Sequence, residues 1–284
     1  MKTGIIILNY NDSKTTIEMI NQIKDFKSLN YILIVDNNST DNSYKTLKKY
    51  EKGNIKVIKT KENKGYAAGN NFGIRYLIKN YKVDYIIISN PDIILKDSDI
   101  KTLQNDLKEN NDIHLIAPNI KELNSIKRGW KLTKFKNDLL SNINYFHKYS
   151  RDFYKAEEYN QKLTKVDVVS GCFFMIRKDV FEKVDFFDEN TFLYYEEDIL
   201  GKKLKDNGYN SYIDNNVVVT HDLSVSIDKS LNSLKKYKIL KESQKYYEKE
   251  YNKLNICGII LLRITYYISY FISFIHYVIS DFWR

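Results

Sequence analysis

Apolar and polar residues alternate along the first 120 residues in a way that predicts strands separated by helices. Short apolar runs typical of buried strands lie at 4–9, 31–36, 55–59, 84–89 and 113–117. Between them, apolar residues recur at helical spacing over 14–27, 41–51, 67–80 and 98–109. This alternation predicts an α/β domain with a mostly parallel central sheet flanked by helices.

Beyond residue 120 the pattern breaks and then returns. Residues 121–165 show little clean period, so we expect a long, partly helical excursion over one side of the domain. The pattern resumes at Val166 and continues through short elements: helices at 178–183 and 199–207, and two strands at 209–213 and 216–220. We therefore expect one domain over residues 1–225 and a separate tail over 226–284.

The tail is basic at first and then strongly apolar. Lysines outnumber glutamates over 229–253, and residues 256–279 are long enough to allow a membrane-spanning helix. Arg263, His276 and several Tyr and Ser make this stretch less apolar than a typical span. We expect a helix lying on or partly in a membrane surface; a true span, a dimerisation hairpin and a helix packed on the main domain are the alternatives.

Composition bounds the class of protein. With 284 residues and 43% hydrophobic residues, the chain can bury a large core and is not a disordered protein. Cys172 and Cys257 are far apart, as expected for buried thiols in a reducing compartment. Gly4 already begins an apolar strand, so we expect no signal peptide and a cytoplasmic start. The net charge of +9 favours an anionic membrane over nucleic acid, because the basic segment adjoins the apolar stretch.

Polar side chains gather where the apolar runs end. Three such clusters are Asn9-Tyr10-Asn11, Asp36-Asn37-Asn38 and Asn90-Pro91-Asp92. In open α/β sheets, ligands bind at the carboxyl ends of the strands. We expect these clusters to form one site.

Three consecutive acids, Glu196, Glu197 and Asp198, stand directly ahead of a helical pattern. A helix N-terminus stabilises negative charge and holds it on a rigid element, which suits a general base. An ordinary acidic N-terminal cap is the alternative.

Six motifs in order carry a resemblance to a known family. They are Ile7–Asn11, Val35–Asp41, Asn63–Gly73, Asn90–Asp92, Ser170–Phe174 and Glu196–Asp198. Over residues 1–222 the chain resembles a family 2 glycosyltransferase of the GT-A fold, of the type that elongates bacterial surface polysaccharides. Its rhamnosyltransferase-like branch, which often uses dTDP-sugars, is the most similar.

The resemblance implies a Rossmann-like half that binds a pyrimidine-nucleotide sugar, dTDP- or UDP-linked, with dTDP-rhamnose as one candidate. The implied contacts are Asn9, Tyr10, Asn11, Asp36, Asn38, Asn63, Gly65, Asn70, Asn90 and Asp92. Asp36 would accept from the pyrimidine N3–H or a ribose hydroxyl. Turn formation and helix capping are the alternatives at these strand ends.

Asn90-Pro91-Asp92 stands where many GT-A enzymes have Asp-X-Asp. By resemblance, Asp92 and His221 would bind a divalent cation, Mg or Mn, that neutralises the diphosphate. Asn90 leaves one carboxylate fewer at this motif. A structural role is the alternative for His221.

The resemblance also implies an inverting transfer in which Asp198 deprotonates the acceptor hydroxyl and Glu197 orients the acceptor. We expect a lipid-linked glycan acceptor at the cytoplasmic face of a bacterial inner membrane, with Arg128, Trp130 and residues 145–154 as an acceptor wall. A non-catalytic sugar-nucleotide-binding scaffold is the rival hypothesis. A nucleic-acid partner is not expected, and a homo-oligomeric state is left open.

Overall fold

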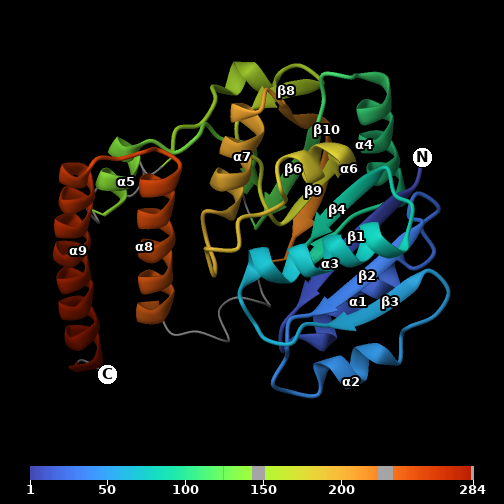
Figure 1. Cartoon of the computed structure of the whole chain (residues 1–284), viewed down its shortest axis with the longest axis horizontal. Helices are drawn as coiled ribbons and strands as arrows, with labels where there is room; N and C mark the ends of the chain where they lie inside the picture. Colours follow the sequence, from blue (N-terminus) through green and yellow to red (C-terminus); the bar gives the residue numbers. More distant parts are fainter. Residues whose placement is uncertain (124, 143–150, 223–232, 283–284) are drawn as a thin grey trace.

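The structure, a computed structural model, describes residues 1–123, 125–142, 151–222 and 233–282 (Figure 1). In this part of the chain the strands form one 10-stranded sheet in which the main path runs β3-β2-β1-β4-β9-β6-β10-β5. The strands are β1 (Thr3–Asn9), β2 (Tyr31–Asp36), β3 (Ile55–Lys59), β4 (Tyr85–Ser89), β5 (Ile93–Ile94), β6 (Leu115–Glu122), β7 (Ser125–Lys127), β8 (Leu163–Val166), β9 (Phe173–Arg177) and β10 (Ser211–His221).

The sheet is mixed, which corrects the expectation of a mostly parallel sheet. The strands β3, β2, β1 and β4 are parallel, but β9 runs antiparallel between β4 and β6. Both neighbours of β9 therefore point the same way, and β10 is parallel to β6. As a result the carboxyl ends of β1, β2, β4, β6 and β10 share one edge with the amino end of β9.

Helices cover both faces of this sheet. The described helices are α1 (Ser13–Ile23), α2 (Ser43–Lys48), α3 (Tyr66–Asn80), α4 (Asp97–Glu109), α5 (Phe135–Ser141), the 3-10 helix η2 (Ala156–Tyr159), α6 (Lys178–Lys183), α7 (Glu196–Asp206), α8 (Ser233–Glu250) and α9 (Ile256–Phe282).

Alternation along β1 explains the two-sided core. Ile5 and Ile7 pack with residues of α1 and α4 in one apolar cluster. Ile6 faces the other way, into a second cluster with residues of α3, α6 and α7. Successive strand side chains point to opposite faces, so a strand buried on both faces must be continuously apolar. The expected two-faced α/β architecture is confirmed.

The two strands expected at 209–213 and 216–220 are a single strand, β10. Its register with β6 shifts between Asp214 and Val218. The Asp214 carboxylate accepts from the Asn216 N–H at 2.8 Å, so polar residues that resemble a turn in the sequence form a bulge instead.

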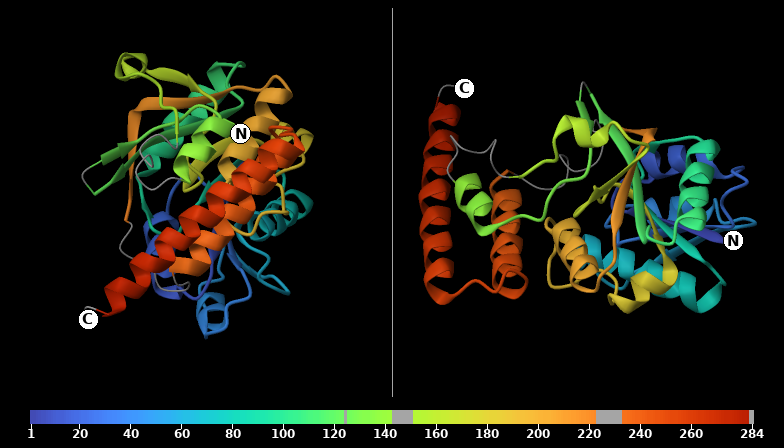
Figure 2. Two further views of the ribbon diagram at one scale, coloured as in Figure 1. Left: turned by 90° about the vertical axis from the view of Figure 1, so that its left-hand side faces the viewer. Right: turned by 90° about the horizontal axis from the view of Figure 1, so that it is seen from above.

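The excursion over 121–165 contains short elements only, β7, α5, η2 and β8 among its described residues. Beyond it, α8 and α9 form a hairpin beside α5, and α9 is the layer farthest from the sheet (Figures 1 and 2). The expected domain boundary at 225 lies outside the described residues. Within those residues, no helix combines the length and apolar character that crossing a membrane requires.

Candidate active site

The turn before β9 joins three of the predicted motifs. The Asn90 N–H donates to the Cys172 carbonyl at 2.8 Å. The Tyr66 hydroxyl donates to the Gly171 carbonyl at 2.8 Å, and the Gly171 N–H donates to Glu197 Oε1 at 3.2 Å. The end of β4 and the beginnings of α3 and α7 therefore meet at one turn, although they are far apart in the sequence.

Asp36 lies at this edge but is fully buried. Its Oδ2 accepts from the Asn9 side-chain amide at 2.9 Å, and its Oδ1 accepts from the Ser39 N–H at 3.0 Å. Both Asp36 and Asn9 are 0% exposed. Both carboxylate oxygens thus accept hydrogen bonds from the protein, and the expected contact of Asp36 with a pyrimidine base stays a prediction. We assign Asp36 to holding the turn after β2.

Near Asp36, Tyr10 and Asn11 are exposed and Asn38 is partly buried. Asn11 and Asn38 have φ angles of 54° and 57°. The side-chain oxygen of Asn11, Oδ1, accepts from the Thr40 N–H at 2.8 Å. Asparagine tolerates this left-handed conformation better than most residues. The two loops are thus locked together, and the Tyr10 ring, 37% exposed, offers an aromatic face beside them.

Gly65 permits a close approach of two protein segments. Its φ is 99°, and an added Cβ would lie 2.0 Å from the Phe192 carbonyl oxygen. That same oxygen accepts from the Tyr66 N–H at 2.9 Å. The segment before α7 therefore occupies the space beside the Gly65 Cα, and the expected contact of Gly65 with a nucleotide stays a prediction.

The two predicted asparagines of this region support the same junction. Asn63 accepts at its side-chain oxygen from the Asn37 amide and from the Gly65 N–H, both at 3.0 Å. Asn70 is 0% exposed and donates to the Tyr66 carbonyl.

Asp92 and His221 are brought together, as predicted. His221 Nε2 lies 3.2 Å from Asp92 Oδ1, and its Nδ1 lies 2.8 Å from Glu122 Oε1. Glu122 was missed, because its place beside His221 depends on the register of β6 with β10. Burial disfavours the charged ring, but Asp92 and Glu122 outweigh it and raise the pKa of His221.

The Asp92–His221 pair fits a divalent cation. It offers one carboxylate oxygen and one imidazole nitrogen, and Glu122 orients the ring from behind, as partners of ligating histidines do. Among the described residues no group of three or more His, Cys, Asp or Glu could hold a metal by itself. The diphosphate of a bound nucleotide would have to supply further ligands.

The three acids at the start of α7 face different surroundings. Glu196 is 5% exposed, and burial with the neighbouring Glu197 raises its pKa to about 8. Asp198 is 2% exposed and accepts from the Thr133 N–H, the Thr133 hydroxyl and the Trp130 indole N–H at 3.2, 2.7 and 3.4 Å. Burial raises the pKa of Asp198 despite Arg151 and Thr133.

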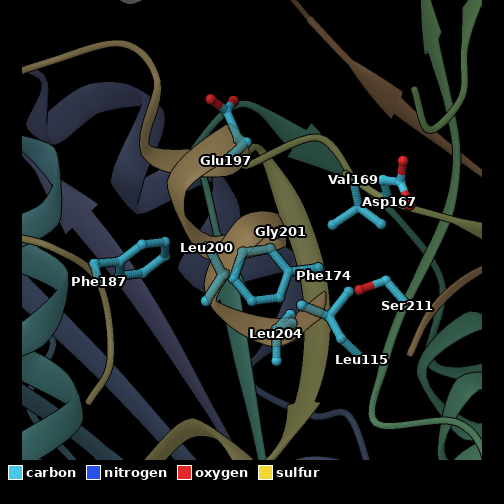
Figure 3. A pocket seen from close by; sticks show the side chains of 10 residues that line it. All are labelled: Leu115, Asp167, Val169, Phe174, Phe187, Glu197, Leu200, Gly201, Leu204 and Ser211. Atoms are coloured by element: carbon cyan, nitrogen blue, oxygen red, sulfur yellow. The ribbon is translucent and has the colours of Figure 1, made fainter. Parts of the chain in front are cut away.

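Glu197 is the partly exposed member of the three. Figure 3 shows its carboxylate directed away from the apolar side chains of Phe174, Leu200 and Leu204 beneath the helix. Successive helical residues point about 100° apart, so the turn that buries Glu196 and Asp198 leaves Glu197 free to face the strand ends.

Two residues before the acids have left-handed backbone. Tyr194 and Tyr195 have φ angles of 74° and 69°. Such conformations cost a bulky residue about 1–2 kcal/mol each, and they persist only where surrounding contacts hold them.

The expected acceptor wall is corrected in part. Trp130 is 3% exposed, and the guanidinium of Arg151 covers its ring at 4.2 Å. Arg128 stacks on Tyr159 at 4.6 Å. Residues 145–150 of the predicted wall lie outside the described residues.

The family model of "Glycosyl transferase family 2" matches residues 4–185. A curated relative, the low-salt glycan biosynthesis hexosyltransferase Agl10 of Haloferax volcanii, is 28% identical over 198 residues. That match covers 68% of this chain and 58% of the relative.

Solved structures give the same fold. GalNAc-T7 with UDP, GalNAc and Mn2+ has a TM-score of 0.66 and 14% identity, over 89% of this chain and 49% of that one. S. aureus TarS 1-349 with UDP-GlcNAc has a TM-score of 0.60 and 15% identity, over 95% and 73%. The predicted GT-A fold is confirmed.

Proposed function

Because the chain belongs to glycosyl transferase family 2, we propose that it transfers a sugar from a nucleotide sugar to an acceptor hydroxyl. One observation carries the proposal: a partly exposed carboxylate, Glu197, lies at the same sheet edge as the Asp92–His221 pair. A single displacement at an anomeric carbon requires a general base for the acceptor and a site that stabilises the leaving group, and these residues would supply both. Agl10 is named a hexosyltransferase, which supports the same reaction class.

We assign the general base to Glu197 in place of Asp198. The acceptor oxygen attacks the anomeric carbon, its proton passes to Glu197, and the bond to the nucleoside diphosphate breaks with inversion. The support is that Asp198 is 2% exposed and accepts hydrogen bonds from Thr133 and Trp130, whereas Glu197 is partly exposed. Asp92 and His221 would hold Mg or Mn, which neutralises the leaving diphosphate when bound.

For the donor we propose a pyrimidine-nucleotide sugar, UDP- or dTDP-linked. The support is now the UDP and UDP-GlcNAc of the structural neighbours and the exposed ring of Tyr10, rather than Asp36. dTDP-rhamnose stays a candidate through the resemblance of the motifs.

We further propose that α9 lies on a membrane, where a lipid-linked glycan would be met at the cytoplasmic face. The outward side of α9 is largely apolar; its exposed apolar residues, 42–76% exposed, are Ile256, Ile260, Leu261, Ile264, Tyr267, Ile268, Phe271 and Ile272. Arg263 is also exposed and lies on this side, at helical spacing from Ile260 and Tyr267. The side of α9 turned to the protein is the more polar one: Thr265 accepts from Asn142 at 2.9 Å, and Ser269 is 1% exposed. An apolar face turned outward over several turns favours a lipid surface.

Charge supports an anionic bilayer over a second copy of the chain. Along α8, α9 and their connection, basic residues outnumber acidic ones; they are Lys235, Lys236, Lys238, Lys241, Lys245, Lys249, Lys253 and Arg263 against Glu242, Glu248, Glu250 and Asp281. Two copies would bring these like charges together, whereas anionic lipids would be attracted to them.

Nucleotide release from UDP-, dTDP- and GDP-sugars, with Mg or Mn and with a chelator, tests the activity. Chelator-sensitive release from one pyrimidine donor is expected. Donor binding without release or transfer, with a panel of glycan acceptors present, would favour the non-catalytic scaffold.

Sedimentation with anionic phosphatidylglycerol vesicles tests the membrane proposal. Ile264→Glu with Ile268→Glu should abolish vesicle binding, whereas Ile126→Glu, on exposed β7, should not. A chain that ignores vesicles and self-associates through α9 would refute it.

A further inference from the structure

The residues immediately before α7 form hydrogen bonds with two other parts of the structure, α3 and α8. We define the pre-helix loop as residues 188–195. On one side, the Phe192 carbonyl accepts from the Tyr66 N–H of α3 at 2.9 Å. On the other side, the Ser243 hydroxyl of α8 donates to the Leu193 carbonyl at 2.8 Å.

Asp188, at the start of the pre-helix loop, accepts two hydrogen bonds from tyrosines of the C-terminal segment. Two phenols donate to the same oxygen, Asp188 Oδ2: Tyr246 at 2.7 Å and Tyr251 at 2.6 Å. Although burial opposes ionisation, these bonds and those from Asn190 lower the pKa of Asp188. Hydrogen bonds to an ionised acceptor are shorter and stronger than neutral ones.

The other end of the loop is fixed by Tyr195. Its ring lies against Tyr247 of α8, with 5.3 Å between centroids, and its hydroxyl donates to Asp138 at 2.5 Å. Tyr195 is one of the two left-handed residues immediately before Glu196. Contacts from α8 and α5 therefore stabilise the backbone conformation that sets the direction of the first turn of α7.

We propose that Tyr246, Tyr251 and Ser243 are positioning residues, which aim Glu197 by fixing the pre-helix loop. The inference rests on the proposed function, because it assigns the loop a role in the transfer step. The α8–α9 hairpin would then be part of the catalytic apparatus as well as a membrane contact. Donor binding should depend little on this hold, since His221 is held by its own contacts with Asp92 and Glu122.

The test is Tyr246→Phe combined with Tyr251→Phe, which keeps both rings and removes both bonds to Asp188. A base displaced by about 1 Å can cost up to about 10²-fold in rate, so kcat should fall about tenfold or more. The donor KM should stay within about twofold, the signature of an interaction needed in the transition state. Tyr266→Phe is the matched control, because Tyr266 stacks on Tyr237 and lies on α9.

Two further measurements keep the inference falsifiable. Ser243→Ala removes the bond to Leu193 alone and should act in the same direction if the double variant does not fold. Amide hydrogen exchange over 188–198 reports the hold on the loop without turnover, and it should speed up in the variants but not in Tyr266→Phe.

Faster exchange with lower kcat and unchanged donor KM supports the inference. Unchanged exchange overturns it, whether or not a donor is turned over, and so does an equal loss of donor binding and kcat. A native protein that turns over no donor refutes the proposed function instead.

Discussion

Glu197→Gln separates the chemistry from the fold more cleanly than any other change at this site. Glutamine keeps a side-chain oxygen that can accept the Gly171 N–H, now 3.2 Å from Glu197. The side chain is partly exposed, so its stability change should stay within about 0.5 kcal/mol. What disappears is the negative charge that takes the acceptor proton.

Loss of a positioned general base costs about 10²–10⁴-fold, or about 3–5 kcal/mol of activation free energy. That is several times the expected change in stability, so the two effects can be told apart. The assay is the initial rate of transfer at saturating donor, with nucleotide binding and thermal unfolding measured on the same preparation. We expect a large loss of kcat with little change in either of the others.

Asp198→Asn is the informative comparison. An asparagine can still accept from Thr133, but its amide would oppose the Trp130 indole N–H, 3.4 Å from the native carboxylate. Leaving a buried donor unpaired costs about 1–3 kcal/mol, so the melting temperature should fall. If Glu197→Gln kept near-native kcat while a well-folded Asp198→Asn were inactive, the assignment of the base would be wrong.

Three further predictions concern other parts of the chain. Gly65→Ala should lose about 1–3 kcal/mol of stability by chemical denaturation, because its Cβ would collide with the Phe192 carbonyl and its φ is 99°. A chelator should abolish nucleotide release, and His221→Ala should raise the Mg or Mn concentration needed to restore it. Burial beside Asp138 raises the pKa of Glu248 from 4.5 to about 8, so the folded state binds more protons than the unfolded chain in that interval. Stability should therefore fall as pH rises from 4.5 to about 8, and Glu248→Gln should flatten the dependence measured by denaturant unfolding.

The hydrophobic periodicity of the sequence predicted the position of several helices and strands correctly. The strands at 31–36 and 55–59 and the helix at 178–183 have the expected bounds, since their periodicity is continuous and punctuated by turns. The direction of β9 was not predictable in the same way. A short strand buried on both faces has the same apolar composition whichever way it runs. The antiparallel direction of β9 therefore depends on the path that the chain takes before and after the strand.

At the candidate site, too, some features could be predicted from the sequence and others depend on packing between distant segments. The resemblance implied that Asp92 and His221 would lie together, and their separation of 3.2 Å agrees with it because carboxyl ends of parallel strands share an edge. Glu122 needed the register of β6 with β10, which no local signal gives. The burial of Asp36 and the contacts of α8 with Asp188 depend on packing between distant segments, so spacing alone could not reveal them.

The three adjacent acids at the start of α7, Glu196, Glu197 and Asp198, have different surroundings and cannot all have the same role. Each residue is turned about 100° from the last, so a helix packed on a sheet cannot present all three to the same surroundings. Burial and the neighbouring Glu197 raise the pKa of Glu196 to about 8, which favours the uncharged form of this acid and reduces repulsion among the three. Asp198 turns toward Thr133 and ties α7 to the segment before α5. The remaining acid, Glu197, faces the strand ends, where it accepts from the Gly171 N–H, while the hydrogen bonds of Asp198 fix the first turn of α7.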